Sequence, residues 1–399
     1  MVFNPGGPWF NIFSITFPNV FIPRSNTQNH GDQPRVWRIL SAFSADALGD
    51  ARELGRDTMM ILKMKKEDLP TFLDSVKEWG ELWGPTKKEG RVSYSKVDSL
   101  SQMDLKATRT IIPPKKFLYP PRFTMFDYDE DGFVERRGDV PRRILFGIHP
   151  CDIHGILIMD KLFLETYNDP YYKERREKTL LLGHSCIPDD KCMCMATNTD
   201  FIAEGFDLFF TDLKMFYLVR VGSTKGHDLV RMKPDLFSRD LGKNEILTYN
   251  EYRNWKNSQF KKQMDFTGMP YIFELGYNSP VWDQLGDKCL SCGQCSMVCP
   301  TCNCYNVTDE VELGALEGIR DRFWDSCMFR EYSLVAGGGN FRDKRADRLR
   351  LWYTHKLQAY IGEFGKPACV GCGRCVETCP VDINVVSVST ALKEQEVGK

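Results

Sequence analysis

The chain has 399 residues, of which 42% are hydrophobic and 27% are charged, and its net charge is -1. This length favours two or three globular domains. The balanced charge gives no indication of a nucleic acid or an acidic membrane surface as partner. No run reaches the roughly 18 consecutive apolar residues that a membrane span needs.

The 15 cysteines are the unusual feature of the composition, and most of them fall in tight groups. A disulfide framework would spread them through a small secreted domain, whereas tight groups are typical of metal ligands. We therefore expect a reducing compartment and a cytoplasmic location.

Residues 1–58 are expected to form an N-terminal extension. Its first 35 residues are rich in Pro, Asn and Gly, and the absence of a basic n-region argues against a secretory signal. We interpret this segment as a flexible or partner-binding extension. Next, apolar residues at helical spacing predict an amphipathic helix over 66–83. The prolines of 111–121 predict a largely extended linker or clasp.

The middle of the chain has the pattern of an α/β domain, which we place at residues 59–280. Short apolar runs at 144–148 and 179–183 predict buried strands, and a helical pattern at 153–166 separates them. This order of a strand, a helix and a second strand predicts that the two strands are parallel and that the helix connects them in a right-handed crossover. Two further strands are expected at 208–210 and 216–221. The expected fold is thus α/β (α+β) up to residue 280, followed by an α-helical two-cluster ferredoxin domain over 281–399.

Two C-x2-C-x2-C-x3-C-P runs carry the strongest chemical signal in the chain. The first comprises Cys289, Cys292, Cys295 and Cys299, and the second comprises Cys369, Cys372, Cys375 and Cys379. A 4Fe–4S cluster needs one thiolate per iron, and in two-cluster ferredoxins the fourth cysteine of each run ligates the other cluster. We therefore predict one cluster on Cys289, Cys292, Cys295 and Cys379, and a second on Cys299, Cys369, Cys372 and Cys375.

Zinc is the alternative for these runs, but zinc sites use two ligand pairs rather than two repeats of four followed by proline. About 70 residues separate the runs, and we expect this insert to be helical, especially over 343–364. The insert contains a basic run from Arg342 to Arg350. Its default interpretation is a solvated helix face, and a docking face for an acidic partner is the alternative.

A third, weaker group lies in the α/β region and consists of Cys151, Cys186, Cys192 and Cys194. If the two predicted strands are parallel, Cys151 and Cys186 follow them at the same carboxyl edge of the sheet, where open α/β sheets place ligands. Four thiols there would hold a third 4Fe–4S cluster, while ordinary buried cysteine is the alternative. Three nearby histidines could compete as ligands but are better explained as supporting residues: His149, His154 and His184.

Cys302, Cys304 and Cys327 remain outside these groups. Three thiols cannot fill a cubane without a further ligand, so free thiols packed beside a cluster are the simpler interpretation. An exchange of ligand roles with Cys299 is the alternative.

The chain resembles the iron–sulfur beta subunit of cytoplasmic sulfhydrogenases and the A subunit of anaerobic sulfite reductase. The likeness covers about residues 60–390 and includes the last cysteine run. It is also carried by Pro113-Pro114-Lys115, His149-Pro150-Cys151-Asp152, Cys192-Met193-Cys194, Gly205-Phe206-Asp207-Leu208, the run from Cys299 to Tyr305, Trp324-Asp325-Ser326-Cys327-Met328, and the stretch from Ala336 to Arg342.

This resemblance implies the third cluster, because the family has cysteines at the same points. It also implies a relay role between a flavin- and NAD(P)H-binding reductase subunit and a terminal redox subunit. That terminal subunit could be a hydrogenase, a sulfite reductase or a heterodisulfide-reductase-type protein. The chain itself shows no Rossmann fingerprint, no nickel-ligand pairs and no sirohaem motif. We therefore expect a non-catalytic electron-transfer subunit. The alternatives are an iron–sulfur redox sensor, or a subunit whose own open-iron cluster is catalytic.

Overall fold

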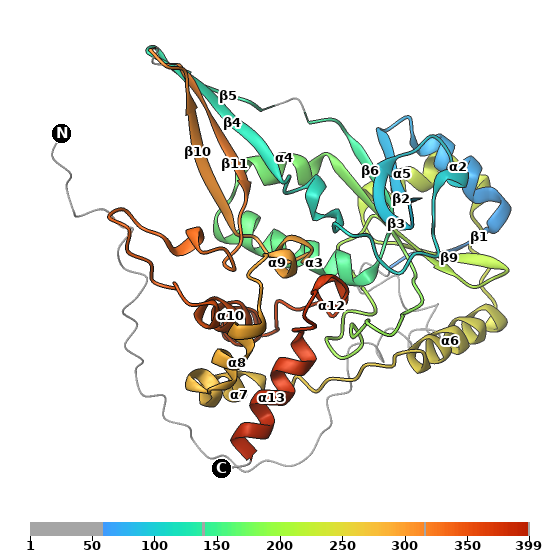
Figure 1. Cartoon of the computed structure of the whole chain (residues 1–399). Helices are drawn as coiled ribbons and strands as arrows, with labels where there is room; N and C mark the ends of the chain where they lie inside the picture. The colour runs from blue at the N-terminus through green and yellow to red at the C-terminus, as the bar shows by residue number, and fades with distance from the viewer. Residues whose placement is uncertain (1–58, 138–139, 315–316, 398–399) are drawn as a thin grey trace, which may run out of the picture. The chain divides into compact units, whose positions relative to one another are not determined.

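The computed structural model describes residues 59–137, 140–314 and 317–397, all within one compact unit, Met59–Lys399 (Figure 1). The expected N-terminal extension, residues 1–58, lies outside the described residues. The unit contains a seven-stranded sheet, a four-stranded sheet and helices. Among the described residues, no helix combines the length and apolarity needed to cross a bilayer.

The seven-stranded sheet has the order β1-β9-β8-β7-β6-β2-β3. Its strands β6, β7 and β8 are parallel to one another, and β2 is parallel to β6. The remaining pairs are antiparallel. The bounds are β1 Ile61–Lys65, β2 Glu81–Lys88, β3 Arg91–Lys96, β6 Arg143–Ile148, β7 Thr179–His184, β8 Leu208–Asp212 and β9 Phe216–Val221.

The predicted strand, helix, strand unit is confirmed as β6, α3 (Pro150–Asp160) and β7, with a π-helical turn at Lys161–Thr166 extending α3. The predicted strands at 208–210 and 216–221 are β8 and β9. The pairing of β6 with β7 shifts register between Phe146 and Ile148, where Gly147 adopts a φ of 80°. This bulge lies just before the first cysteine of the third group.

Both faces of the central strands are buried, which explains their uninterrupted apolar runs. Ile144 and Phe146 pack on one face with α2 (Leu69–Val76), and Leu145 and Ile148 pack on the other face with α3. The surrounding helices are α4 (Pro170–Glu177), α5 (Thr224–Met232) and α6 (Lys243–Ser258).

The helices of the C-terminal part pack around a second apolar core that contains Phe273, Trp282 and Trp352. Their bounds are α7 Met269–Leu275, α8 Val281–Lys288, α9 Gln294–Met297, α10 Arg345–Thr354, α11 Tyr360–Phe364, α12 Arg374–Thr378 and α13 Val385–Val397. A π-helical turn at His355–Ala359 joins α10 to α11. The expected helix over 343–364 is therefore confirmed from Arg345 onward.

The four-stranded sheet has the order β10-β11-β4-β5 and joins segments that are distant in sequence. Strands β4 (Arg122–Asp129) and β5 (Gly132–Glu135) come from the middle of the chain. Strands β10 (Tyr305–Val311) and β11 (Gly318–Trp324) come from the insert between the two cysteine runs. The expectation of a helical insert is therefore wrong over these strands.

Two other expectations need correction. The predicted helix over 66–83 is shorter: a 3-10 turn at Lys66–Asp68 precedes α2, and the chain enters β2 at Glu81. The segment 111–121 is not extended throughout, because Pro114–Phe117 form a 3-10 helix. Proline suits the first turn of a helix, where its missing N–H removes no bond. The other 3-10 turns are Leu100–Gln102, Pro234–Leu236, Gly276–Asn278 and Glu331–Ser333.

Candidate metal centres

The first candidate centre is a cavity whose lining includes Cys289, Cys292, Cys295 and Cys379. Cys289 follows the last residue of α8, and Cys379 follows α12, so two helix ends deliver the two outer thiols. The rest of the lining is mostly apolar and includes Leu349, Trp352, Tyr353 and Ile383. Backbone N–H groups already point at two sulfurs: Ser291 donates to Cys289 Sγ (3.3 Å) and Ile383 donates to Cys379 Sγ (3.3 Å).

The loop of this centre depends on a glycine that no other residue could replace without strain. Gly293 adopts a φ of 71°, and a Cβ built there would lie 2.4 Å from the Phe329 ring. The basic run of the insert supports the same loop. Arg345 donates to the Cys289 carbonyl (2.8 Å), and the buried Arg348 donates to Ser291 Oγ (3.1 Å). These two arginines hold the loop, a role that neither interpretation of the basic run, a solvated helix face or a docking face, had included.

The second candidate centre brings Cys299 from the first run beside three cysteines of the second run. The charge of Cys299 acts on the thiols of Cys369, Cys372 and Cys375. Burial raises the pKa of Cys369 to about 12, so a thiolate here needs a metal or a cation to stabilise it. Two buried lysines supply positive charge. Lys356 Nζ donates to Cys299 Sγ (3.4 Å) and Thr301 Oγ1 (2.9 Å), and Lys115 Nζ donates to the Cys302 carbonyl (2.6 Å).

The third candidate centre gathers Cys151, Cys186, Cys192 and Cys194, whose charges act on one another. Cys151 lies in the first turn of α3, and Cys186 follows β7, so parallel strands bring both to one edge of the sheet as predicted. Cys192 and Cys194 are buried on the loop that leaves this edge. Lys256 of α6 is buried near this group and donates to the Asp200 carbonyl (2.7 Å). Burial alone would lower the pKa of Lys256, but the negative charges of Cys186, Asp200 and Cys194 raise it.

The third centre packs directly against the second cysteine run. The Met193 N–H donates to the Gly371 carbonyl (2.8 Å), and Thr199 Oγ1 donates to the Val370 carbonyl (2.7 Å). At Gly371 the φ is 61°, and a Cβ would meet the backbone N of Cys194 at 2.5 Å. The second and third centres are therefore neighbours in one structure.

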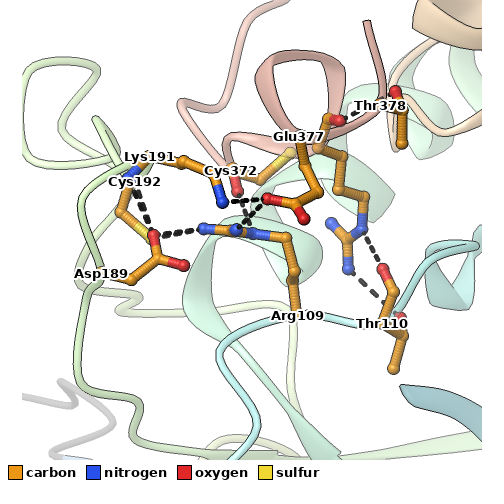
Figure 2. Close-up of polar contacts among 9 residues, drawn as sticks. Arg109, Thr110, Asp189, Lys191, Cys192, Cys372, Glu377 and Thr378 are labelled. Atoms are coloured by element: carbon orange, nitrogen blue, oxygen red, sulfur yellow. Dashed lines mark hydrogen bonds and ion pairs between the residues drawn. The ribbon is translucent and has the colours of Figure 1, made fainter. Parts of the chain in front are cut away.

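Two arginines tie this junction together, as Figure 2 shows for Arg109. Arg109 donates through Nη2 to Asp189 Oδ1 (2.5 Å) and Cys192 Sγ (3.2 Å), and through Nε to the Cys372 carbonyl (3.1 Å). Arg374, inside the second run, forms a fully buried bidentate pair with Asp152 (2.6 and 2.8 Å). Bidentate pairs fix geometry as well as charge.

The cysteines outside the three groups form thiol contacts of their own. Cys302 hydrogen-bonds with Cys299, and Cys304 hydrogen-bonds with Cys327 and with Tyr332. The contact with Cys327 is the main cause that lowers the pKa of Cys304 to about 6. Among the described residues, no three His, Cys, Asp or Glu side chains converge tightly enough for a single metal ion.

The three histidines near the third group occupy separate environments. His184 packs between the rings of Phe146 and Tyr217, and burial lowers its pKa to about 4. His154 Nε2 bonds the Phe201 carbonyl (2.8 Å). His149 is the N-cap residue of α3, and burial lowers its pKa to about 4. The hydrogen bond to the Phe201 carbonyl accounts for His154 without a metal.

Sequence reasoning assigned no role to the largely buried cations around the centres: Arg109, Lys115, Lys256, Lys356 and Arg374. Two of them had a usable signal, because Arg374 stands inside a cysteine run and Lys115 belongs to the Pro113-Pro114-Lys115 stretch of the family resemblance. The others lie far in sequence from the thiols that they contact, and a charged residue is by default assigned to solvent.

The comparisons with known proteins fit this geometry. A family model described as a 4Fe-4S dicluster domain matches residues 288–383, which span both cysteine runs. The C-terminal part of the chain thus defines it as an iron–sulfur protein of the dicluster class.

The relationship extends well beyond that domain. The chain is 41% identical over 336 residues to sulfhydrogenase 2 subunit beta of Pyrococcus furiosus, covering 84% of this chain and 99% of the relative. The chain belongs to this family of hydrogenase beta subunits, as the sequence resemblance had indicated.

Proposed function

We propose that this chain is a non-catalytic iron–sulfur subunit that relays electrons within an anaerobic oxidoreductase complex. The observation that carries the proposal is the meeting of three groups of four cysteines, two of which share a packed junction. Bound 4Fe–4S clusters would supply one-electron redox chemistry at these sites. The location would be cytoplasmic, in keeping with the many free thiols.

The ligand sets follow the sulfurs that lie together. Cys289, Cys292, Cys295 and Cys379 would hold the first cluster, and Cys299, Cys369, Cys372 and Cys375 the second. Cys151, Cys186, Cys192 and Cys194 would hold the third. The cavity lining supports the first set, and the mutual influence of the thiol charges supports the other two.

The surroundings suit the storage of negative charge. A thiolate-ligated cluster is anionic, and buried anions need nearby cations or hydrogen-bond donors. Lys356 lies at the second group, Arg109 lies between the second and third, and Lys256 lies at the third. Apolar side chains such as Ile158, Phe260 and Val370 pack around Cys151, Cys192 and Cys194.

We keep the division into domains that the sequence predicts, within the one compact unit that residues 59–399 form. An α/β domain over 59–280 would carry the third cluster, and a helical ferredoxin-type domain over 281–399 would carry the other two. The pairing of β11 with β4 would tie the two domains together.

Partners at both ends of the relay complete the proposal. One would be a flavin- and NAD(P)H-binding reductase subunit, and the other a hydrogenase, sulfite reductase or heterodisulfide-reductase-type subunit. The family membership supports a complex, since the relative is named as a subunit of a sulfhydrogenase.

The test is anaerobic purification of the complex with iron and sulfide counts on this subunit. We expect about twelve irons, whereas about eight would remove the third cluster from the proposal. Zinc in place of iron, or no paramagnetic signal after reduction, would contradict the relay altogether.

The matching variant is Cys292→Ala. It should remove about four irons and block electron flow from the natural donor, while the partner's activity with an artificial dye survives. Cys327→Ser is the control, because Cys327 lies outside the three groups and should keep the full iron count. Equal loss of the dye-linked and donor-linked activities in Cys292→Ala would contradict a relay.

A further inference from the structure

The two outer strands of the four-stranded sheet, β5 and β10, are exposed on both faces. Every residue of β5 and β10 is exposed, although a sheet normally buries at least one face against another layer. The proximal end differs, because Trp324 Nε1 donates to the Tyr119 carbonyl (3.0 Å) and the buried Arg322 pairs with Asp169. The sheet is thus fixed at one end, and its other end lacks a covering layer in the described structure. Figure 1 shows β4, β5, β10 and β11 running together to this end.

Large apolar side chains gather at this uncovered end. Phe133 is 67% exposed, Val134 70% and Val311 57%, and Leu313 is fully exposed. Single exposed apolar residues are ordinary, but several at one end of a small sheet indicate an interaction surface.

The same end carries strong negative charge. The segments 127–135 and 309–319 contain nine Asp and Glu residues and no Lys or Arg. Four of the nine pair with arginines that flank these segments: Asp127, Glu135, Asp309 and Glu310. For the other five, no ion pair is recorded among the described residues: Asp129, Glu130, Asp131, Glu312 and Glu317.

The outer strand leaves backbone groups free as well. Strand β10 lies at the edge of its sheet and contains neither Lys nor Pro, the residues that commonly protect an edge. An open edge can accept a strand from another protein.

We propose that the end of the four-stranded sheet formed by residues 127–135, 309–314 and 317–319 docks a different subunit of the complex through a basic surface with an apolar centre. The proposal rests on the proposed function only in requiring that a complex exists. A second copy of this chain does not fit, because two acidic ends would repel each other. An anionic membrane or a nucleic acid is disfavoured for the same reason.

Zero-length carbodiimide cross-linking of the native complex tests the proposal, because this reagent joins a carboxylate to a lysine amine in direct contact. Analysis of the cross-linked peptides should find Glu312 or Glu317 joined to a lysine of another subunit. Cross-links from these residues only to lysines of this chain, or to a second copy of it, would overturn the proposal.

Charge reversal gives an independent measurement. The variant Glu312→Lys/Glu317→Lys should weaken retention of one subunit about tenfold, and the wild-type interaction should weaken as salt is raised. The variant Phe133→Ser/Leu313→Ser, which removes two exposed apolar side chains, should also weaken retention of that subunit. The matched control is Asp235→Lys/Glu251→Lys, which reverses two exposed carboxylates away from the sheet and should retain every subunit.

Iron content separates this proposal from the relay. Both sheet variants should keep the wild-type iron count, since neither touches a cysteine group. Full retention of all subunits by both variants would overturn the docking surface and leave the relay standing. A wild-type chain that carries its iron but forms no complex would overturn both.

Discussion

Lys356 shows how one buried cation can stabilise negative sulfur at a metal site. It is buried, and its neighbours are the sulfurs of Cys299, Cys302 and Cys369. No carboxylate within the described chain forms an ion pair with it. Burial alone would lower the pKa of Lys356, but thiolate charge raises it. The hydrogen bond from Cys302 and the charge of Lys356 in turn hold the pKa of Cys299 well below its usual value, so negative sulfur is favoured there even without iron.

Lys356→Met should therefore be unfavourable with and without iron. In iron-loaded protein, loss of the cation should lower the midpoint potential of one centre by about 60 mV, equivalent to about tenfold in a one-electron equilibrium. In iron-free protein, the same change should lower the free energy of unfolding by about 1–3 kcal/mol, because Cys299 Sγ loses the buried cation that donates to it.

Potentiometric titration followed by electron paramagnetic resonance, with thermal unfolding of the iron-free chain, measures both effects. Lys261→Met, on an exposed residue, should change neither. A higher unfolding temperature of iron-free Lys356→Met would show that Lys356 is an unpaired buried charge in the absence of iron.

Arg109 acts at the same scale, through geometry as well as charge. Its guanidinium donates to Cys192 Sγ and to the Cys372 carbonyl, so it touches the second and third groups at once. Lysine cannot reproduce this fork. Arg109→Lys should keep the iron count but shift the potential of the third centre, as measured by the same titration. The exposed Arg231→Lys serves as control. An unchanged potential in Arg109→Lys would mean that charge alone matters there.

At the scale of elements, the junction between the second and third groups depends on a loop with no room for a side chain. Gly371 and Gly365 have similar backbones, with φ of 61° and 70°, but differ in surroundings. A Cβ at Gly371 would collide with the Cys194 backbone, whereas a Cβ at Gly365 would meet nothing within 4 Å.

Gly371→Ala should thus cost more than Gly365→Ala. The left-handed backbone alone costs about 1–2 kcal/mol, and overpacking adds about 1–3 kcal/mol. We also expect about four irons to be lost from Gly371→Ala and none from Gly365→Ala. Unfolding temperature and iron content check both statements, and equal effects would mean that the contact with the third loop is unimportant.

The elements also show what sequence could and could not predict. The central strands were predictable, because burial of both faces gives runs such as Ile144 to Ile148. The pair β10 and β11 could not be predicted. Both faces of β10 are exposed, so its sequence lacks the alternation of apolar residues by which a strand is recognised.

The cysteine groups divide in the same way. Spacing predicts the two C-terminal runs from local chemistry alone. The third group needed the strand order, since Cys151 and Cys186 meet only because β6 and β7 are parallel. The supporting cations depend on long-range contacts, such as that between Arg374 and Thr110, which are 264 positions apart, and no local pattern encodes these.

At the scale of the whole molecule, the crossed arrangement makes a prediction about additivity. Cys292 and Cys379 line the same cavity although they belong to different runs. Each single alanine variant should lose about four irons, and the double variant Cys292→Ala/Cys379→Ala should also lose about four.

A second double variant, in which both cysteines belong to one run, should lose more iron than the first. Cys292→Ala/Cys299→Ala changes two cysteines of one run, yet it should lose about eight irons, because Cys299 lies with the second run. Iron counts on the four variants decide the matter. Loss of eight by the first double variant and four by the second would mean that each run ligates its own cluster.

The shared junction also constrains the order in which the protein can mature. Cys151, Cys186, Cys192 and Cys194 leave the ribosome well before Gly371, on whose backbone their loop rests. The first cavity is likewise incomplete until Cys379 has been synthesised, because Cys379 lines it together with Cys289, Cys292 and Cys295. None of the three proposed sites is complete until the second cysteine run has been synthesised, so iron and sulfide would be delivered after that run emerges, to thiols that have been kept reduced.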